Sequence, residues 1–285
     1  MPVQTSAAGA ELDVHRLDMT VRRALAYAAG IEETAPALFD DARPGGITAP
    51  PQFCVSPEWP VVSGPKSREA GGMTDEERVR AVHAIQDSVF HAAIRPGMKL
   101  KTTGRIISVR RARAGAHMVT RMETRDENSD ALLVTSWSTR ILRDVETEGE
   151  DTILSRPDEL PAVSGADEFE STVPIAATMP HTYTECADIW NPIHTERSVA
   201  LAAGLPDIIL HGTATWALAG REVMRRHSPD EPERLKRLHG RFTAMVFPGH
   251  DMRVVQQRMK DGAVGFAVYN HLGQRALSDG VAVIG

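Results

Sequence analysis

A Pro-Gly turn that occurs twice most constrains the fold of this chain. Residues 95–100 read Arg-Pro-Gly-Met-Lys-Leu, and residues 247–252 read Phe-Pro-Gly-His-Asp-Met. Each turn follows one predicted strand and precedes three more. Pro-Gly turns are common, so the turn alone proves nothing. Two tandem units of helix plus sheet would explain both the repeated turn and the length of 285 residues.

Hydrophobic periodicity separates predicted helices from predicted strands. Apolar side chains share one face over residues 20–29, which predicts a helix that ends at Gly30. Residues 34–74 are rich in Pro and Gly and predict a long irregular stretch. Further helices are predicted at 195–203 and 212–226, and strands at 99–109, 117–123, 131–141, 170–179, 235–246, 252–259, 263–270 and 275–284.

Charge and proline content predict where the two halves join. Residues 146–150 form an acidic run, and residues 151–168 are polar and contain Pro. We therefore predict a first domain over residues 1–150, a linker over 151–168 and a second domain over 169–285.

Composition excludes several classes of function. The chain is 42% hydrophobic and 25% charged, the balance of a soluble globular protein. A net charge of -6 argues against a nucleic-acid partner. Cys54 and Cys186 have no metal-binding spacing and predict no disulfide framework. No signal peptide and no membrane-spanning run is expected, which predicts a cytoplasmic protein.

Two groups of arginines stand out within this acidic chain. Each group is compatible with an ordinary solvated face, or with a landing site for the phosphates of a CoA or phosphopantetheine carrier. The two groups are Arg105, Arg110, Arg111 and Arg113, and Arg221, Arg225, Arg226 and Arg234.

Residues 188–194 are the most informative part of the sequence. Asn191 and Pro192 predict a turn followed by a helix start, because Asn caps exposed amides and Pro suits the first helical position. His194 would then lie in the first turn, where the helix field disfavours its charged form. Asp188 lies just upstream. A neutral imidazole near a carboxylate is a workable acid/base pair.

A second feature is the sequence Leu-His-Gly-Thr at residues 210–213, just ahead of a predicted helix. Gly212 at the helix start can present a bare backbone N–H to a ligand carbonyl, as an oxyanion or enolate stabiliser requires. Each feature also has a bland explanation. Asp188 can be a helix-capping residue, His194 a structural histidine, and Gly212 a glycine that only marks the start of a helix.

The combination of these motifs resembles the hydratase-2 motif of MaoC-like (R)-specific enoyl-CoA hydratases. The resemblance rests on Asn-Pro-Ile-His at residues 191–194, Ala-Gly-Leu-Pro at 203–206 and Ile-Leu-His-Gly at 209–212. The first half resembles the divergent N-terminal domain of two-domain members. The resemblance implies an α+β double hotdog, in which each unit wraps a helix with an antiparallel sheet and only the second unit carries a site.

The spacing departs from the family pattern, which places Asp five positions before the catalytic His. That position is Ile189 here, and Asp188 lies six positions before His194. Either one residue is inserted and Asp188 still reaches the site, or the carboxylate of the dyad is lost. The five-residue step from Tyr183 to Asp188 matches the family and favours the first account.

The resemblance implies reversible hydration and dehydration of an enoyl or 3-hydroxyacyl thioester by a lyase. Asp188 and His194 would hold the water, and the Gly212 N–H would bind the thioester carbonyl. The substrate would be carried on CoA or an acyl carrier, with no metal or redox cofactor. A homodimer or hetero-assembly is expected, without membrane contact. Substrate-positioning roles are assigned to Asn191, His211, Tyr183 and Trp190, with His181 as a weaker candidate.

Two alternatives remain open at this point. A hotdog thioesterase would also bind acyl-CoA with a carboxylate, and it would release free CoA. A non-catalytic acyl-carrier-binding subunit, or a hotdog recruited for cyclisation, would retain the carbonyl-binding pocket without the acid/base pair.

Overall fold

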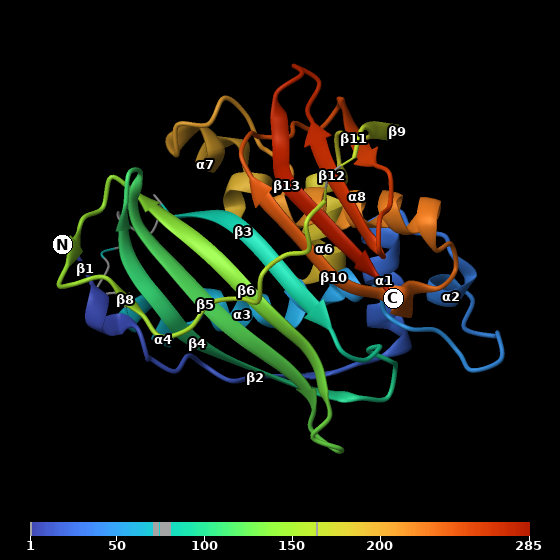
Figure 1. Ribbon diagram of the computed structural model, residues 1–285, viewed down its shortest axis with the longest axis horizontal. Helices are drawn as coiled ribbons and strands as arrows, with labels where there is room; N and C mark the ends of the chain where they lie inside the picture. The colour runs from blue at the N-terminus through green and yellow to red at the C-terminus, as the bar shows by residue number, and fades with distance from the viewer. Residues whose placement is uncertain (1, 71–73, 75–80, 164) are drawn as a thin grey trace.

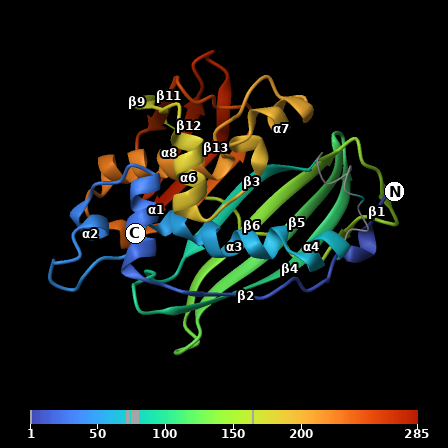
Figure 2. The same cartoon turned by 180° about the vertical axis from the view of Figure 1, so that it is seen from behind.

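The computed structural model describes residues 2–70, 74, 81–163 and 165–285. One antiparallel sheet runs through the molecule, and the helices lie on one of its faces (Figures 1 and 2). Its strand order is β2-β4-β5-β6-β3-β10-β13-β12-β11-β9, with β8 paired to β4. Strands of the first half occupy one end of this order and strands of the second half the other. The two units therefore meet edge to edge where β3 pairs with β10.

The first unit contains more helix than the sequence predicted. Residues 34–74 were expected to be irregular, and that prediction was wrong for most of the segment, whose positions 71–73 lie outside the described residues. Pro36, Pro51 and Pro65 each stand in the first turn of a helix, where a missing N–H costs nothing. The helices are α1 (Val21–Gly30), α2 (Pro36–Phe39), η2 (Pro51–Cys54), α3 (Val55–Ser63) and α4 (Pro65–Ala70).

Five long or central strands complete the first unit, and α3 lies across them (Figure 2). They are β2 (His15–Asp18), β3 (Ala81–Phe90), β4 (Lys99–Ala112), β5 (Gly115–Asp126) and β6 (Leu132–Arg143). Four short elements lie near the chain start and the linker: β1 (Val3–Gln4), η1 (Thr5–Ala7), β7 (Thr147–Glu148) and β8 (Thr152–Ile153).

The second unit follows the predicted pattern closely in its strands and in its long helix. The strand predicted at 170–179 ends at Pro174, and a helix begins at Met179 and occupies the predicted loop, with Pro180 in its first turn. The elements are β9 (Asp167–Pro174), α6 (Met179–Ala187), η3 (Pro192–His194), α7 (Arg197–Ala202), α8 (Gly212–His227), η4 (Pro232–Arg234), β10 (Leu235–Phe242), β11 (Asp251–Gln257), β12 (Ala263–Tyr269) and β13 (Arg275–Ile284).

The repeated Pro-Gly turn occupies the same place in both units. The N–H of Gly97 donates to the carbonyl of Met19, and the N–H of Gly249 donates to the carbonyl of Ile175, each over 2.7 Å. In return, the N–H of Met19 donates to the carbonyl of Met98 and the N–H of Ile175 donates to the carbonyl of His250, in each unit the residue after the glycine. Both glycines have positive φ, 95° and 82°, which suits glycine. The repeat seen in the sequence is therefore a structural repeat.

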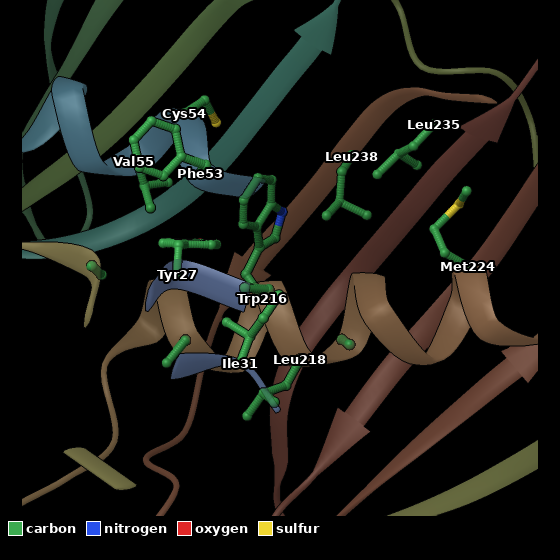
Figure 3. Packing of buried hydrophobic residues seen from close by; sticks show 14 of the residues in the cluster. Tyr27, Ile31, Phe53, Cys54, Val55, Trp216, Leu218, Met224, Leu235 and Leu238 are labelled. Carbon is green, nitrogen blue, oxygen red and sulfur yellow. The ribbon is translucent and has the colours of Figure 1, made fainter. Parts of the chain in front are cut away.

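One hydrophobic core joins the two units. Figure 3 shows Trp216 of α8 packed among Tyr27 of α1, Phe53 of η2 and Leu238 of β10. Fully burying an apolar side chain of this size stabilises the fold by roughly 1.5–3 kcal/mol. In the described part of the chain, no helix is long and apolar enough to cross a membrane.

Candidate functional site

His194 ends the short helix η3, and its ring orientation is fixed by one hydrogen bond. Asn191 caps η3, and its side chain accepts a hydrogen bond from the N–H of Ile193. The His194 side chain is nearly buried, at 9% exposed, and its Nδ1 lies 2.9 Å from the carbonyl oxygen of Ile209. Because a carbonyl only accepts, Nδ1 carries the proton and Nε2 is left as a proton acceptor.

The environment of His194 keeps the imidazole neutral. Burial lowers the pKa of His194 to about 4, and the hydrogen bond to Ile209 opposes this shift only in part. A neutral histidine with a free Nε2 is the form that a general base requires near neutral pH.

His211 stacks on His194 and connects it to the start of α8. The two ring centroids are 3.8 Å apart, with an interplanar angle of 26°. Nε2 of His211 lies 3.1 Å from Oγ1 of Thr184 on α6. Burial, and to a lesser extent the neighbouring His194 ring, hold the pKa of His211 well below its usual value. Both rings are therefore uncharged and fixed in position.

Gly212 begins α8 directly after His211. The first N–H groups of a helix have no partner within the helix, so this end offers donors to a ligand. A Cβ atom at Gly212 would lie 3.4 Å from the ring of Phe242, tight against its neighbour. Gly212 therefore follows directly on the histidine that stacks against the neutral ring of His194.

Tyr183 supports His211 from the interior. It is fully buried on α6, with its ring centroid 5.0 Å from that of His211. Its hydroxyl lies 3.5 Å from that of Tyr27, which donates to the carbonyl of Gln52 over 2.8 Å. Burial raises the pKa of Tyr183 to about 12. Its ring packs against the ring of His211.

Asp188 forms no hydrogen bond or ion pair with the histidine pair His194 and His211 among the described residues. It ends α6 in a left-handed conformation with φ 56°, and its side chain is 78% exposed. Its Oδ2 lies 3.5 Å from Nη1 of Arg23 on α1. Ile189, at the position where the family has Asp, is 4% exposed and packs in the core.

The remaining candidates lie around this centre. Trp190 is 61% exposed at the surface. Nε2 of His181 lies 3.0 Å from the carbonyl oxygen of Thr195, a contact that ties α6 to the loop after η3. Thr184, which holds His211, was missed by sequence reasoning, because a single threonine in a predicted loop carried no signal. In the described residues no group of three or more His, Cys, Asp or Glu side chains is arranged to hold a metal.

The second arginine group is largely structural. Arg221 is buried and donates to the carbonyl of Ile31 over 2.6 Å, and it also pairs with Glu222. Arg225 donates to the carbonyl of Glu32 over 2.7 Å. These side chains hold α8 against the loop after α1 and leave little charge free for a phosphate.

Comparison with known families agrees with this description. The family model described as MaoC like domain matches residues 162–271, and the model described as FAS1-like, dehydratase domain region matches residues 6–136. Together the two matches account for most of both units.

Curated relatives carry related names. A probable enoyl-CoA hydratase 2 of Dictyostelium discoideum is 33% identical over 95 residues, which are 33% of this chain and 32% of that protein. A 3-hydroxyacyl-thioester dehydratase Y of Mycobacterium tuberculosis is 25% identical over 276 residues, which cover 93% of this chain and 91% of that protein.

Among solved structures, a MaoC-like dehydratase from Phytophthora capsici superposes with a TM-score of 0.85. It shares 20% sequence identity, over 97% of this chain and 95% of that chain. The double-hotdog fold predicted from the sequence is thereby confirmed.

Proposed function

We propose, for a chain that belongs to the MaoC-like dehydratases, that it reversibly hydrates an enoyl thioester to a 3-hydroxyacyl thioester. The observation that carries the proposal is the neutral His194 ring, with its Nδ1–H committed to Ile209, near the first backbone amides of α8, which have no partner within the helix. A base and an electrophilic amide at one place are what addition of water to an enoyl thioester requires.

The proton transfers run through His194. The thioester carbonyl accepts a hydrogen bond from the Gly212 N–H, which stabilises the enolate as charge develops on the oxygen. Nε2 of His194 takes a proton from water while the water oxygen bonds to the β-carbon. The imidazolium then returns that proton to the α-carbon, so that H and OH have added across the double bond. Dehydration is the reverse.

In this mechanism one histidine serves as both base and acid. His211 and Thr184 position the ring of His194, and Asn191 fixes the turn that carries it. Asp188 caps the C-terminal end of α6, and its largely exposed carboxylate pairs with Arg23. We therefore assign Asp188 no proton transfer. The competing proposal is the Asp188/His194 dyad of the family pattern, which would require the carboxylate to turn inward.

We further propose that CoA or phosphopantetheine carries the acyl group and that no metal or redox group takes part. Every proton in the reaction above is handled by His194 and water, which supports this. We place the protein in the cytoplasm as a homodimer or part of a larger assembly. Two free cysteines, Cys54 and Cys186, suit a reducing compartment. Sedimentation of the purified chain tests the assembly, and fractionation of cells tests the location.

Hydration of crotonyl-CoA and of a longer enoyl-CoA, followed at the enoyl-thioester absorbance, tests the proposed function. We expect His194→Ala to lower kcat/KM by roughly 10²- to 10⁴-fold, the contribution of a general acid/base group. His91→Ala is the matched control, because His91 is an exposed histidine of the first unit whose Nε2 contacts the hydroxyl of Thr135. Wild-type hydration by the His194→Ala protein would overturn the proposal.

The same assay separates the two alternative functions. Release of free CoA, detected with a thiol reagent, would identify a thioesterase. Tight binding of acyl-CoA with neither reaction would identify a non-catalytic or recruited hotdog.

A further inference from the structure

A cavity lies on the opposite face of the sheet from the helices. It has a volume of about 560 Å³, which is within the range of small-molecule sites. The chain between β8 and β9 passes over this face in Figure 1, whereas α3, α6 and α1 cover the other face in Figure 2. Strand alternation agrees with this placement. Gln86 and Ser136 point to Glu58 on α3, so their neighbours Asp87 and Trp137 point away from the helices and into the cavity.

The floor of the cavity is apolar. Ile85, Val119 and Trp137 line it from the sheet, and Ile153 and Leu160 line it from the linker. The Trp137 indole offers a flat surface on which a ring can stack. Its Nε1 and the Nδ1 of His117 are buried and have no hydrogen-bond partner among the described residues. An unpaired buried donor is costly, and an oxygen acceptor on an occupant would relieve that cost.

The rim of the cavity is positively charged. Arg110, Arg156 and Arg237 line it against the carboxylates of Asp87 and Asp158. Arg237 is already neutralised, because it forms a buried bidentate pair with Asp87 at 2.8 and 2.6 Å. Among the described residues no ion pair engages Arg110 or Arg156. Their guanidinium groups are therefore available to an anion.

His117 adds no charge to the cavity. Burial, followed by the nearby Arg110 and Arg241, lowers the pKa of His117 to about 4. The ring is therefore neutral near pH 7, and the positive charge of the cavity comes from its arginines. Nδ1 of His239 is occupied by the carbonyl of Asp279 over 2.8 Å. The anionic head of a ligand would therefore find its partners at Arg110 and Arg156.

The linker is fastened at both ends of the cavity. β8 pairs with β4, and Leu154 donates to the carbonyl of Ile107 over 2.8 Å. At the other end Arg237 donates to the carbonyls of Asp158 and Glu159. Residues 155–157 span the cavity between these two fastenings, so the roof is held in place while the mouth remains accessible.

We propose that this cavity is a binding site for a small amphipathic organic acid, separate from the thioester site. The carboxylate pairs with Arg110 and Arg156, and the apolar body, an aromatic ring in the best fit, packs on Trp137 and Val119. The site lies across the seam between the two units, because Asp87 belongs to β3 and Arg237 to β10. The proposal stands whether or not the hydratase proposal holds.

Isothermal titration with 2-naphthoate tests the site, with 2-naphthamide as the uncharged analogue. We expect one saturable site for the acid, and about tenfold weaker binding in Arg110→Gln and in Arg156→Gln, the usual scale for one charged hydrogen bond. Binding of the amide should be weaker by a similar factor. Arg22→Gln is the matched control, since Arg22 is an exposed arginine on α1 on the other face. This variant should bind as wild type does.

His194→Ala distinguishes this cavity from the thioester site. It should bind 2-naphthoate with unchanged affinity, and the indole N–H resonance lost in a Trp137→Phe protein should be the one that shifts on binding. Absence of saturable binding, equal binding of acid and amide, wild-type affinity in both arginine variants, or loss of binding in His194→Ala would each overturn the proposal.

Discussion

The two hotdog units share one topology but use their central helices differently. α8 of the second unit runs over 16 residues and begins at a glycine next to two stacked histidines. α3 of the first unit runs over 9 residues, contains Pro60 and follows directly from η2, so it presents no comparable capped start. Both units keep the same Pro-Gly turn, bonded in the same way. The scaffold is therefore repeated, whereas the site depends on what the sequence places at one helix start.

The first unit buries a carboxyl group where the second buries imidazoles. Glu58 of α3 is 3% exposed, and its oxygens accept hydrogen bonds from Ser136 at 2.5 Å and from Gln86 at 3.1 Å. Burial raises the pKa of Glu58 to about 7, against the hydrogen bonds, which lower it. This acid fastens α3 to the sheet, whereas among the described residues no hydrogen bond engages Nε2 of His194 in the second unit. The comparison predicts different responses to mutation in the two halves.

The largest expected effect on the free energy of unfolding lies where β3 of the first unit pairs with β10 of the second. Asp87 and Arg237 form a buried bidentate pair between β3 and β10. We expect Asp87→Ala to lower the free energy of unfolding by about 3–5 kcal/mol, because it leaves a buried guanidinium unpaired. Denaturant titration of the full chain measures the loss, with the exposed Arg253–Glu170 pair as a control of little effect.

A double variant shows whether charge or packing is responsible. Asp87→Leu combined with Arg237→Leu removes both charges, so it should recover most of the stability lost by the single change. If the single variant is as stable as wild type, the seam is held by the shared core alone. The buried ion pair would then contribute nothing to the stability of the contact between the two units.

The next prediction concerns how the free energy of unfolding depends on pH, which should have opposite sign for the buried groups of the two units. Glu58 has a raised folded pKa of about 7 against 4.5 for the free group, so the folded state holds its proton longer. Its contribution to stability is full below pH 4.5, falls as the pH rises and is lost above pH 7. The difference amounts to about 3 kcal/mol. The difference in unfolding free energy between wild type and Glu58→Gln should follow this curve, while the exposed Glu69→Gln should not.

His194 should behave in the opposite way. Its folded pKa is depressed to about 4 from 6.5, so its contribution is full above pH 6.5 and is lost as the pH falls toward 4. Unfolding of His194→Gln against wild type measures this. A parallel pH dependence in Glu58→Gln and His194→Gln would mean that the two buried groups do not differ as their surroundings indicate.

How far the sequence predicts this molecule differs between elements. The strand at residues 275–284 and the helix that starts at Gly212 were predicted nearly to the residue. Hydrophobic periodicity and the residues that begin or end an element are local signals, so they can be read from the sequence. The helices within residues 36–70 were missed, since proline in a first turn looks the same in a sequence as proline in a loop. The motif placed His194 and Gly212 near one another, and in the structure His194 stacks on His211, the residue before Gly212.

The position of Asp188 could not be predicted from spacing. Asp188 follows the last residue of α6 and adopts a left-handed conformation there. That turn directs Ile189 into the core and Asp188 toward Arg23. Sequence spacing specifies which residues are near one another along the chain. Which of two neighbours faces the core depends on packing.

A smaller effect sharpens the comparison of the two helix starts. Gly212→Ala would place a methyl group about 3.4 Å from the Phe242 ring, next to the proposed carbonyl site. We expect kcat/KM for enoyl-CoA hydration to fall roughly 10²-fold, the usual cost of misplacing a substrate by an ångström. Stability should be nearly unchanged. Cys54→Ala, at the start of α3, is the control and should retain activity. Equal activity of both variants would mean that Gly212 does not bind the substrate.

The smallest expected effect concerns Asp188, and it decides between one histidine and a dyad. Asp188→Asn removes an exposed ion pair with Arg23 worth about 0–1 kcal/mol and keeps a residue that tolerates the left-handed conformation. If His194 performs both proton transfers, kcat/KM should stay within about twofold of wild type, because Asp188 touches no reacting atom. Arg23→Gln is the matched variant, since it frees the carboxylate without removing it. A loss of hundredfold or more in Asp188→Asn, with Arg23→Gln as active as wild type, would show that Asp188 turns inward during turnover. The second unit would then carry the family's dyad at a shifted spacing.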